Sequence, residues 1–234
     1  MKVPAEIQRL AIQGLEQMYA NPKHLFDWRI RRSLYQQFQK EDQAAGYQAH
    51  GWLAVIAAEH VLPIFTSTFP HDLLPVRLVR YAKRILTGSI ARTSRRIDIL
   101  EDDGYMSTGI DMIELRDGVI AYNAEYAGAA AYHALMEARG AHHLLDSVET
   151  LRRRDGFYVM GGGTQRPEFD GYEQGSSFTD EDIAHLAAYC DTAGVAAIAF
   201  SCNREQFQIQ PERLQEYWEW WVQVAIQEAW SLVQ

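Results

Sequence analysis

Apolar residues recur at three- and four-residue spacing through much of the first half of the chain, which is the period of an α-helix with one buried face. The spacing predicts helices at Pro4 to Tyr19, from a capping Asp27 through Phe38, at His50 to Phe65 and at Leu73 to Thr87. In the second helix the pattern places Arg31 on a solvated face. Pro63 should kink or end the third helix, because proline has no amide hydrogen to donate.

The second half of the chain is richer in alanine, glycine and aromatic residues. It predicts an alanine-rich buried helix at Val119 to Ala138, a shorter one at His142 to Arg153, one from Thr179 to Ser201, and a closing helix opened by Pro211 that covers Leu214 to Leu232. Residues 155–178 indicate one long ordered loop, in which Phe157 to Met160 could add a short strand. Residues 95–118 contain turn dipeptides and receive no assignment.

These elements define an all-α protein with at most minor strand content. Strands do not alternate with helices along the chain, so a parallel α/β sheet is not expected. We expect one helical domain over residues 1–234, built as an irregular array or bundle of about eight helices.

Composition favours a soluble, cytoplasmic protein. Hydrophobic residues make up 47% of the chain, and no apolar run reaches the roughly 20 residues of a membrane span. The N-terminus becomes polar at once, unlike a signal peptide. Cys190 and Cys202 are expected to be buried, reduced thiols, because one helix holding both would separate them by about 18 Å.

The negative charge is concentrated in the last third of the sequence. The net charge is -9, and residues 155–234 hold thirteen acidic but only three basic side chains. Such a distribution argues against nucleic acid as the main ligand and suits a basic protein partner. Solubility alone would also explain it.

A search for catalytic motifs finds none. The triglycine Gly161 to Gly163 lacks the Lys-Ser/Thr of a phosphate-binding loop, and no serine or cysteine lies in a nucleophile signature. The chain has eight histidines. Only His133 has an acidic residue, Glu137, at a helical spacing suited to metal binding, and a hydrogen bond is the alternative role for this pair. A metal-dependent helical enzyme would have to use Glu59, His60, His133 and Glu137.

The closing helix carries more aromatic rings than one core-facing stripe can hold. Trp218 and Trp221 share one face, and Tyr217 and Trp220 lie on a neighbouring face. Either the helix is buried on two sides, or one ring, Trp220, is exposed for a partner.

Three stretches together resemble the immunity protein 5 family of bacterial polymorphic toxin systems. They are EHVLPIFTSTFPHDLLPVRLVRYAKRILTG at Glu59 to Gly88, YAGAAAYHALMEARG at Tyr126 to Gly140, and the closing LQEYWEWWVQVAIQEAW. The charged segment Arg92 to Asp117 departs from the family pattern, which has longer alanine- and histidine-rich helices there. The resemblance implies an all-helical protein that binds the toxin in the producing cell and neutralises it without catalysis.

The sequence therefore predicts an immunity protein with a cognate toxin as partner, for example a basic nuclease-type toxin, and with no cofactor or metal ion. The expected contact surface combines acidic residues before and after the alanine-rich helix with one aromatic ring: Glu101, Asp102, Asp103, Asp170, Glu173 and Trp220. The metal-dependent enzyme and a helical module with some other partner remain the alternatives, and the oligomeric state is open.

Overall fold

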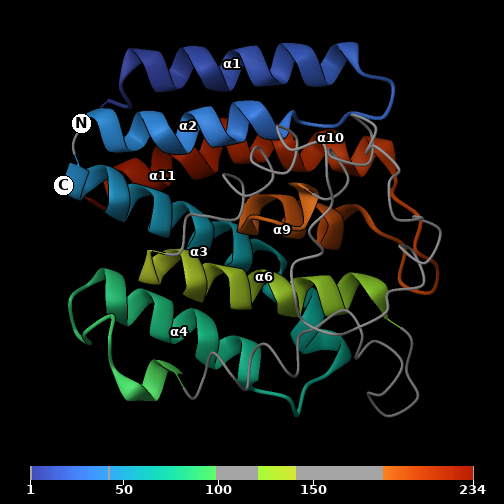
Figure 1. Cartoon of the computed structure of the whole chain (residues 1–234). Coiled ribbons are helices and arrows are strands. Elements are labelled where there is room, and N and C mark those ends of the chain that lie inside the picture. The colour runs from blue at the N-terminus through green and yellow to red at the C-terminus, as the bar shows by residue number, and fades with distance from the viewer. Residues whose placement is uncertain (1, 42, 99–120, 141–186, 234) are drawn as a thin grey trace, which may run out of the picture.

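Figure 1 shows the computed structural model, which describes residues 2–41, 43–98, 121–140 and 187–233. These residues form eight α-helices and no sheet, which confirms the all-α fold; an isolated bridge joins Cys202 to Ile209. The helices are α1 (Ala5–Ala20), α2 (Trp28–Glu41), α3 (Gln43–Thr68), α4 (Leu74–Leu86), α6 (Tyr122–Arg139), α9 (Thr192–Ser201), α10 (Pro211–Trp220) and α11 (Ile226–Ser231). A π-helical turn, η3 (Trp221–Ala225), joins the last two.

The helices are stacked in layers around α3 and α6. In Figure 1, α1 lies at the top, α2 follows with α10 and α11 behind it, and α4 lies at the bottom. The most extensive contacts join α3 to α6, and α6 also packs on α4 and α9. Accordingly, α6 is buried along most of its length, as its alanine-rich sequence predicts, and it ends at Gly140 in the left-handed conformation (φ 99°).

The third helix is longer than the sequence predicts. It begins at Gln43 and continues through Pro63 to Thr68, so the expectation that Pro63 could end it is wrong. Residues Leu53 to Ala58 are buried on every side, because α3 packs against α2, α4, α6 and α9. Tertiary packing of this extent outweighs the loss of one backbone hydrogen bond at an exposed proline.

The helix predicted up to Ser201 is interrupted. The chain turns at Tyr189–Cys190, and Asp191 then caps α9, its carboxylate accepting a hydrogen bond from the Gly194 amide at 3.3 Å. A single helix through this point is therefore wrong. Its predicted start at Thr179 lies outside the described residues, as do the helix at 142–153 and the loop at 155–178 with its possible strand.

The closing helix is buried on two sides, between α1 on one side and α9 and α3 on the other. Pro211 occupies its first turn, as predicted. Trp218 and Trp221 are buried, and their rings meet edge to face at 5.6 Å beside Phe26. In the described part of the chain, no helix has both the length and the apolar composition needed to cross a membrane.

Candidate functional site

The interior contains a buried ion pair between α2 and the start of α9. Arg31 on α2 binds Asp191 through two contacts, Nε to Oδ2 at 2.9 Å and Nη2 to Oδ1 at 3.1 Å. The guanidinium also donates to the backbone oxygens of Phe26 and Ala187 at 2.9 and 3.1 Å. Arg31 and Asp191 are each 3% exposed, so the expectation of a solvated Arg31 is wrong. The bidentate geometry and the two carbonyl acceptors compensate for burying the charge.

A second buried carboxylate, Glu137 on α6, links α3 to α9. Its Oε1 accepts hydrogen bonds from the backbone amide and the hydroxyl of Thr192, both at 2.7 Å. Its Oε2 lies 2.8 Å from Nε2 of His50, on α3. Glu137 therefore has three polar partners, the amide and hydroxyl of Thr192 on α9 and the imidazole of His50 on α3.

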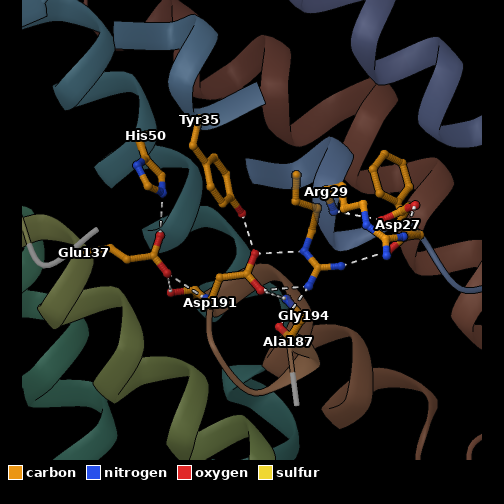
Figure 2. A network of polar contacts seen from close by, with 11 residues as sticks. Asp27, Arg29, Tyr35, His50, Glu137, Ala187, Asp191 and Gly194 are labelled. Atoms are coloured by element: carbon orange, nitrogen blue, oxygen red, sulfur yellow. Dashed lines mark hydrogen bonds and ion pairs between the residues drawn. The ribbon is translucent and has the colours of Figure 1, made fainter. Parts of the chain in front are cut away.

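Tyr35 joins the two carboxylate clusters into one network, which Figure 2 shows from close by. Its hydroxyl donates to Asp191 Oδ2 at 2.7 Å, and its ring stacks on the imidazole of His50 at a centroid distance of 4.0 Å. The network therefore connects α2, α3, α6 and α9. We call the set Arg31, Tyr35, His50, Glu137, Asp191 and Thr192 the polar core.

Burial and hydrogen bonding set the proton affinities in the polar core. Burial alone would raise the pKa of Glu137. The hydrogen bond and the electrostatic effect of His50, together with the two hydrogen bonds from Thr192, outweigh this effect and lower the pKa to about 2. Burial raises the pKa of Tyr35 well above its usual value, and the charge of Asp191 adds to this. Tyr35 therefore stays protonated, as a hydrogen-bond donor must.

The polar core has the residue types of an acid–base site but not the access that such a site needs. Every member is buried, and its carboxylates bind other buried groups. It cross-links four helices instead. Cys190, next to Asp191, is no nucleophile either, because burial and the neighbouring carboxylate raise the pKa of its thiol to about 12. Neither Cys190 nor Cys202 forms a disulfide, and Cys202 is the less exposed of the two.

At the surface, half-exposed planar side chains from α3, α9 and α10 lie in contact. His60 stacks on Trp220 with centroids 3.6 Å apart and planes 14° from parallel. Phe200 lies 5.3 Å from His60 on the other side, and the Arg213 guanidinium lies 4.8 Å from the Phe200 ring. Burial lowers the pKa of His60 and so favours the neutral imidazole, although Glu216 favours the charged form. We call Phe200, His60 and Trp220 the aromatic row.

The structure separates the residues of the metal-site alternative. Glu59 forms an exposed ion pair with Lys83 at 2.6 Å, His60 stacks on Trp220, and Glu137 belongs to the polar core. Burial lowers the pKa of His133, which lies near Glu137 and Asp191. Within the described residues, no three histidine, cysteine or acidic side chains converge to hold a metal ion.

Of the predicted contact surface, the structure describes only Trp220. Its ring is half-exposed, one face covered by His60, so it is neither fully buried nor fully free. The predicted acidic residues Glu101, Asp102, Asp103, Asp170 and Glu173 lie outside the described residues.

Sequence reasoning missed most of the polar core. Of its members, only Glu137 was a candidate, with His133 as its assumed partner. Asp191, directly before the apolar stretch TAGVAAIAFS, was one available signal, since aspartate before such a stretch is typical of a helix N-cap. A second signal was overlooked in α2: Arg31 precedes Leu34 and Phe38 by three and seven positions, which places it on the apolar face of the helix, unlike Arg29 and Arg32.

Comparison with known proteins adds no assignment: no protein-family model matches the chain, and no curated protein matches it.

The buried ion pair should show strong energetic coupling. Asp191→Asn or Arg31→Met alone leaves a buried group without its counter-charge and should cost about 3–5 kcal/mol of unfolding free energy. The double variant should cost at least about 2 kcal/mol less than the sum of the two. Urea denaturation of the four proteins measures this. The exposed pair Glu59 and Lys83 is the matched control, with an expected coupling of about 0.5 kcal/mol; similar coupling in both pairs would contradict the assignment.

The ionised Glu137 should make the free energy of unfolding depend on pH in the acidic range. Its pKa is lower in the folded than in the unfolded protein, so its contribution is complete above about pH 4.5 and is lost as the pH falls towards 2. The difference in unfolding free energy between wild type and Glu137→Gln should therefore shrink over this interval. Thr192→Val, which removes one donor to the carboxylate, should move the loss to higher pH. Denaturation series at several pH values test both, and a difference independent of pH would refute the role of the charge.

Proposed function

We propose that this chain neutralises a protein toxin by binding it, as an immunity protein of a bacterial polymorphic toxin system. The observation that carries the proposal is the difference in chemistry between the interior and the surface. The acid–base groups of the polar core bind one another in the interior, whereas the aromatic row remains half-exposed beside carboxylates. A buried centre with a tryptophan at the surface suits recognition better than turnover.

Charge supports a basic target. The last third of the sequence carries nearly all of the net negative charge, and an acidic surface accelerates encounter with a basic protein. The order of the three family-like stretches supports the same class of protein. On this proposal the chain inhibits by covering the toxin's active site or by holding the toxin in an inactive form.

Growth rescue is the direct test. We expect a secreted toxin to be encoded beside this gene, and co-expression of this chain should restore growth of cells that the toxin alone arrests. Because binding consumes one copy of the protein per toxin, purified protein should inhibit the toxin only as the two approach equal amounts. Protection at a small fraction of the toxin concentration would indicate catalysis and would overturn the proposal, as would failure to rescue.

The acidic residues should govern the rate of association. Asp102→Lys combined with Asp103→Lys should slow association with the toxin by about tenfold at low salt, and less at high salt, because screening weakens long-range attraction. Stopped-flow or surface-binding kinetics measure this rate. Glu16→Lys combined with Glu228→Lys changes the net charge equally at exposed positions of α1 and α11 and is the matched control. Equal slowing by both would mean that net charge, not a particular surface, steers the encounter.

A further inference from the structure

We propose that the Trp220 end of the aromatic row, together with Glu216, receives an arginine side chain of the partner. This inference rests on the proposed function and names the chemistry of one contact within it. The surface belongs to α10, whose outward side carries Glu212 and Glu216, both exposed. From Pro211 to Ser231 the sequence holds four acidic side chains and a single basic one, so this helix favours a cationic group.

Helical spacing places Glu216 on the same face of α10 as the half-exposed indole of Trp220. Glu216 precedes Trp220 by four positions, so both side chains lie on one face of α10. Glu216 also favours the charged form of His60, which stacks on Trp220, as expected of a carboxylate on this face of the helix. A guanidinium lying on the indole could thus donate to Glu216 while its plane contacts the ring, a combination that arginine offers and lysine does not.

The row already holds one guanidinium from its own chain. Arg213 lies over Phe200 at 4.8 Å, at the opposite end from Trp220. Burial lowers the pKa of His60 between the two ends, which favours its neutral form and so weakens its repulsion of a second cation. The row is therefore compatible with guanidinium stacking, and its tryptophan end, the better ring for a cation, is half-exposed.

A π-helical turn directly follows the Trp220 end of the aromatic row. It begins at Trp221, directly after Trp220, and π-turns inside α-helices often accompany functional sites. Trp221 is fully buried, whereas Val224, within the same turn, is 47% exposed. Val224, four positions after Trp220, thus exposes an apolar side chain about one turn along the helix from the half-exposed indole, and aromatic and apolar side chains together are typical of a small protein-binding hot spot.

An oligo-arginine peptide is the first probe, with oligo-lysine and oligo-glutamate peptides for comparison. In NMR titrations of the intact protein, the arginine peptide should shift the indole resonance of Trp220 and the ring resonances of His60. Lysine should shift them less and glutamate not at all. Trp220→Leu and Glu216→Gln should each weaken binding by about tenfold, the loss expected for one cation–π or charge-assisted contact.

Glu212→Gln is the matched control, because it removes an exposed carboxylate from the same helix. It should leave the affinity nearly unchanged, and an equal loss would mean that general charge, not this contact, binds the peptide. Shifts confined to other residues would also overturn the inference. Glu216→Gln keeps the test valid if Trp220→Leu disturbs folding, since the Glu216 side chain is exposed.

Experiments with the toxin distinguish a failure of the arginine contact from a failure of the proposed function. Trp220→Leu and Glu216→Gln should both weaken toxin binding and lower protection in the growth assay. If both variants bind and protect fully, the arginine contact is wrong while the proposed function stands. If the wild-type protein does not protect, the proposed function fails, and the peptide titration alone then decides whether the surface binds arginine.

Discussion

The burial of the Glu137 and Asp191 carboxylates side by side between four helices is the constraint that the rest of this structure satisfies. A buried carboxylate is tolerated only where donors surround it, and here the donors come from different helices. Asp191 needs Arg31 and Tyr35 from α2, and Glu137 needs His50 from α3 and Thr192 from α9. Because these bonds are directional, they fix how the four helices lie against one another, whereas the surrounding alanine and leucine contacts would allow neighbouring registers.

Much of the fold follows from local pattern. The period of apolar residues identifies α1, α2, α4 and the closing helix, and the alanine-rich sequence of α6 identifies a helix that others approach closely. The errors occur where tertiary structure decides. Packing on several sides carries α3 through Pro63, and the cap at Asp191 divides a stretch that looks continuous. The π-turn adds a residue to one turn and shifts the phase of every later position, so that Tyr217, Trp221, Ala225 and Ala229 recur on the buried side every four residues, a period that a template of 3.6 residues per turn does not detect.

The candidate sites were less predictable than the fold. Trp220 could be singled out because too many rings compete for one core stripe, and the structure does place it at the boundary between core and solvent. Its stacking partner His60 comes from α3, far away in the sequence, and no spacing rule connects the two. The same holds for Arg31 and Asp191. Long-range pairs of this kind depend on the arrangement of helices, which a single sequence does not state.

The placement of chemistry in the described part of the chain supports the binding role that we propose. The acid–base groups of the polar core lie inside and bind one another, and the surface of α10 offers a ring and carboxylates that can recognise a partner. The resemblance to immunity proteins and the acidic last third of the sequence agree with such a role.

The separation of Arg31 and Asp191 has a consequence for synthesis on the ribosome. These residues are 160 positions apart, so α2 emerges and can collapse on α1 and α3 long before its counter-ion exists. Until then the guanidinium must remain hydrated, which keeps that part of the nascent core open to water. The N-terminal helices therefore complete their packing around this ion pair only after α9 has left the exit tunnel.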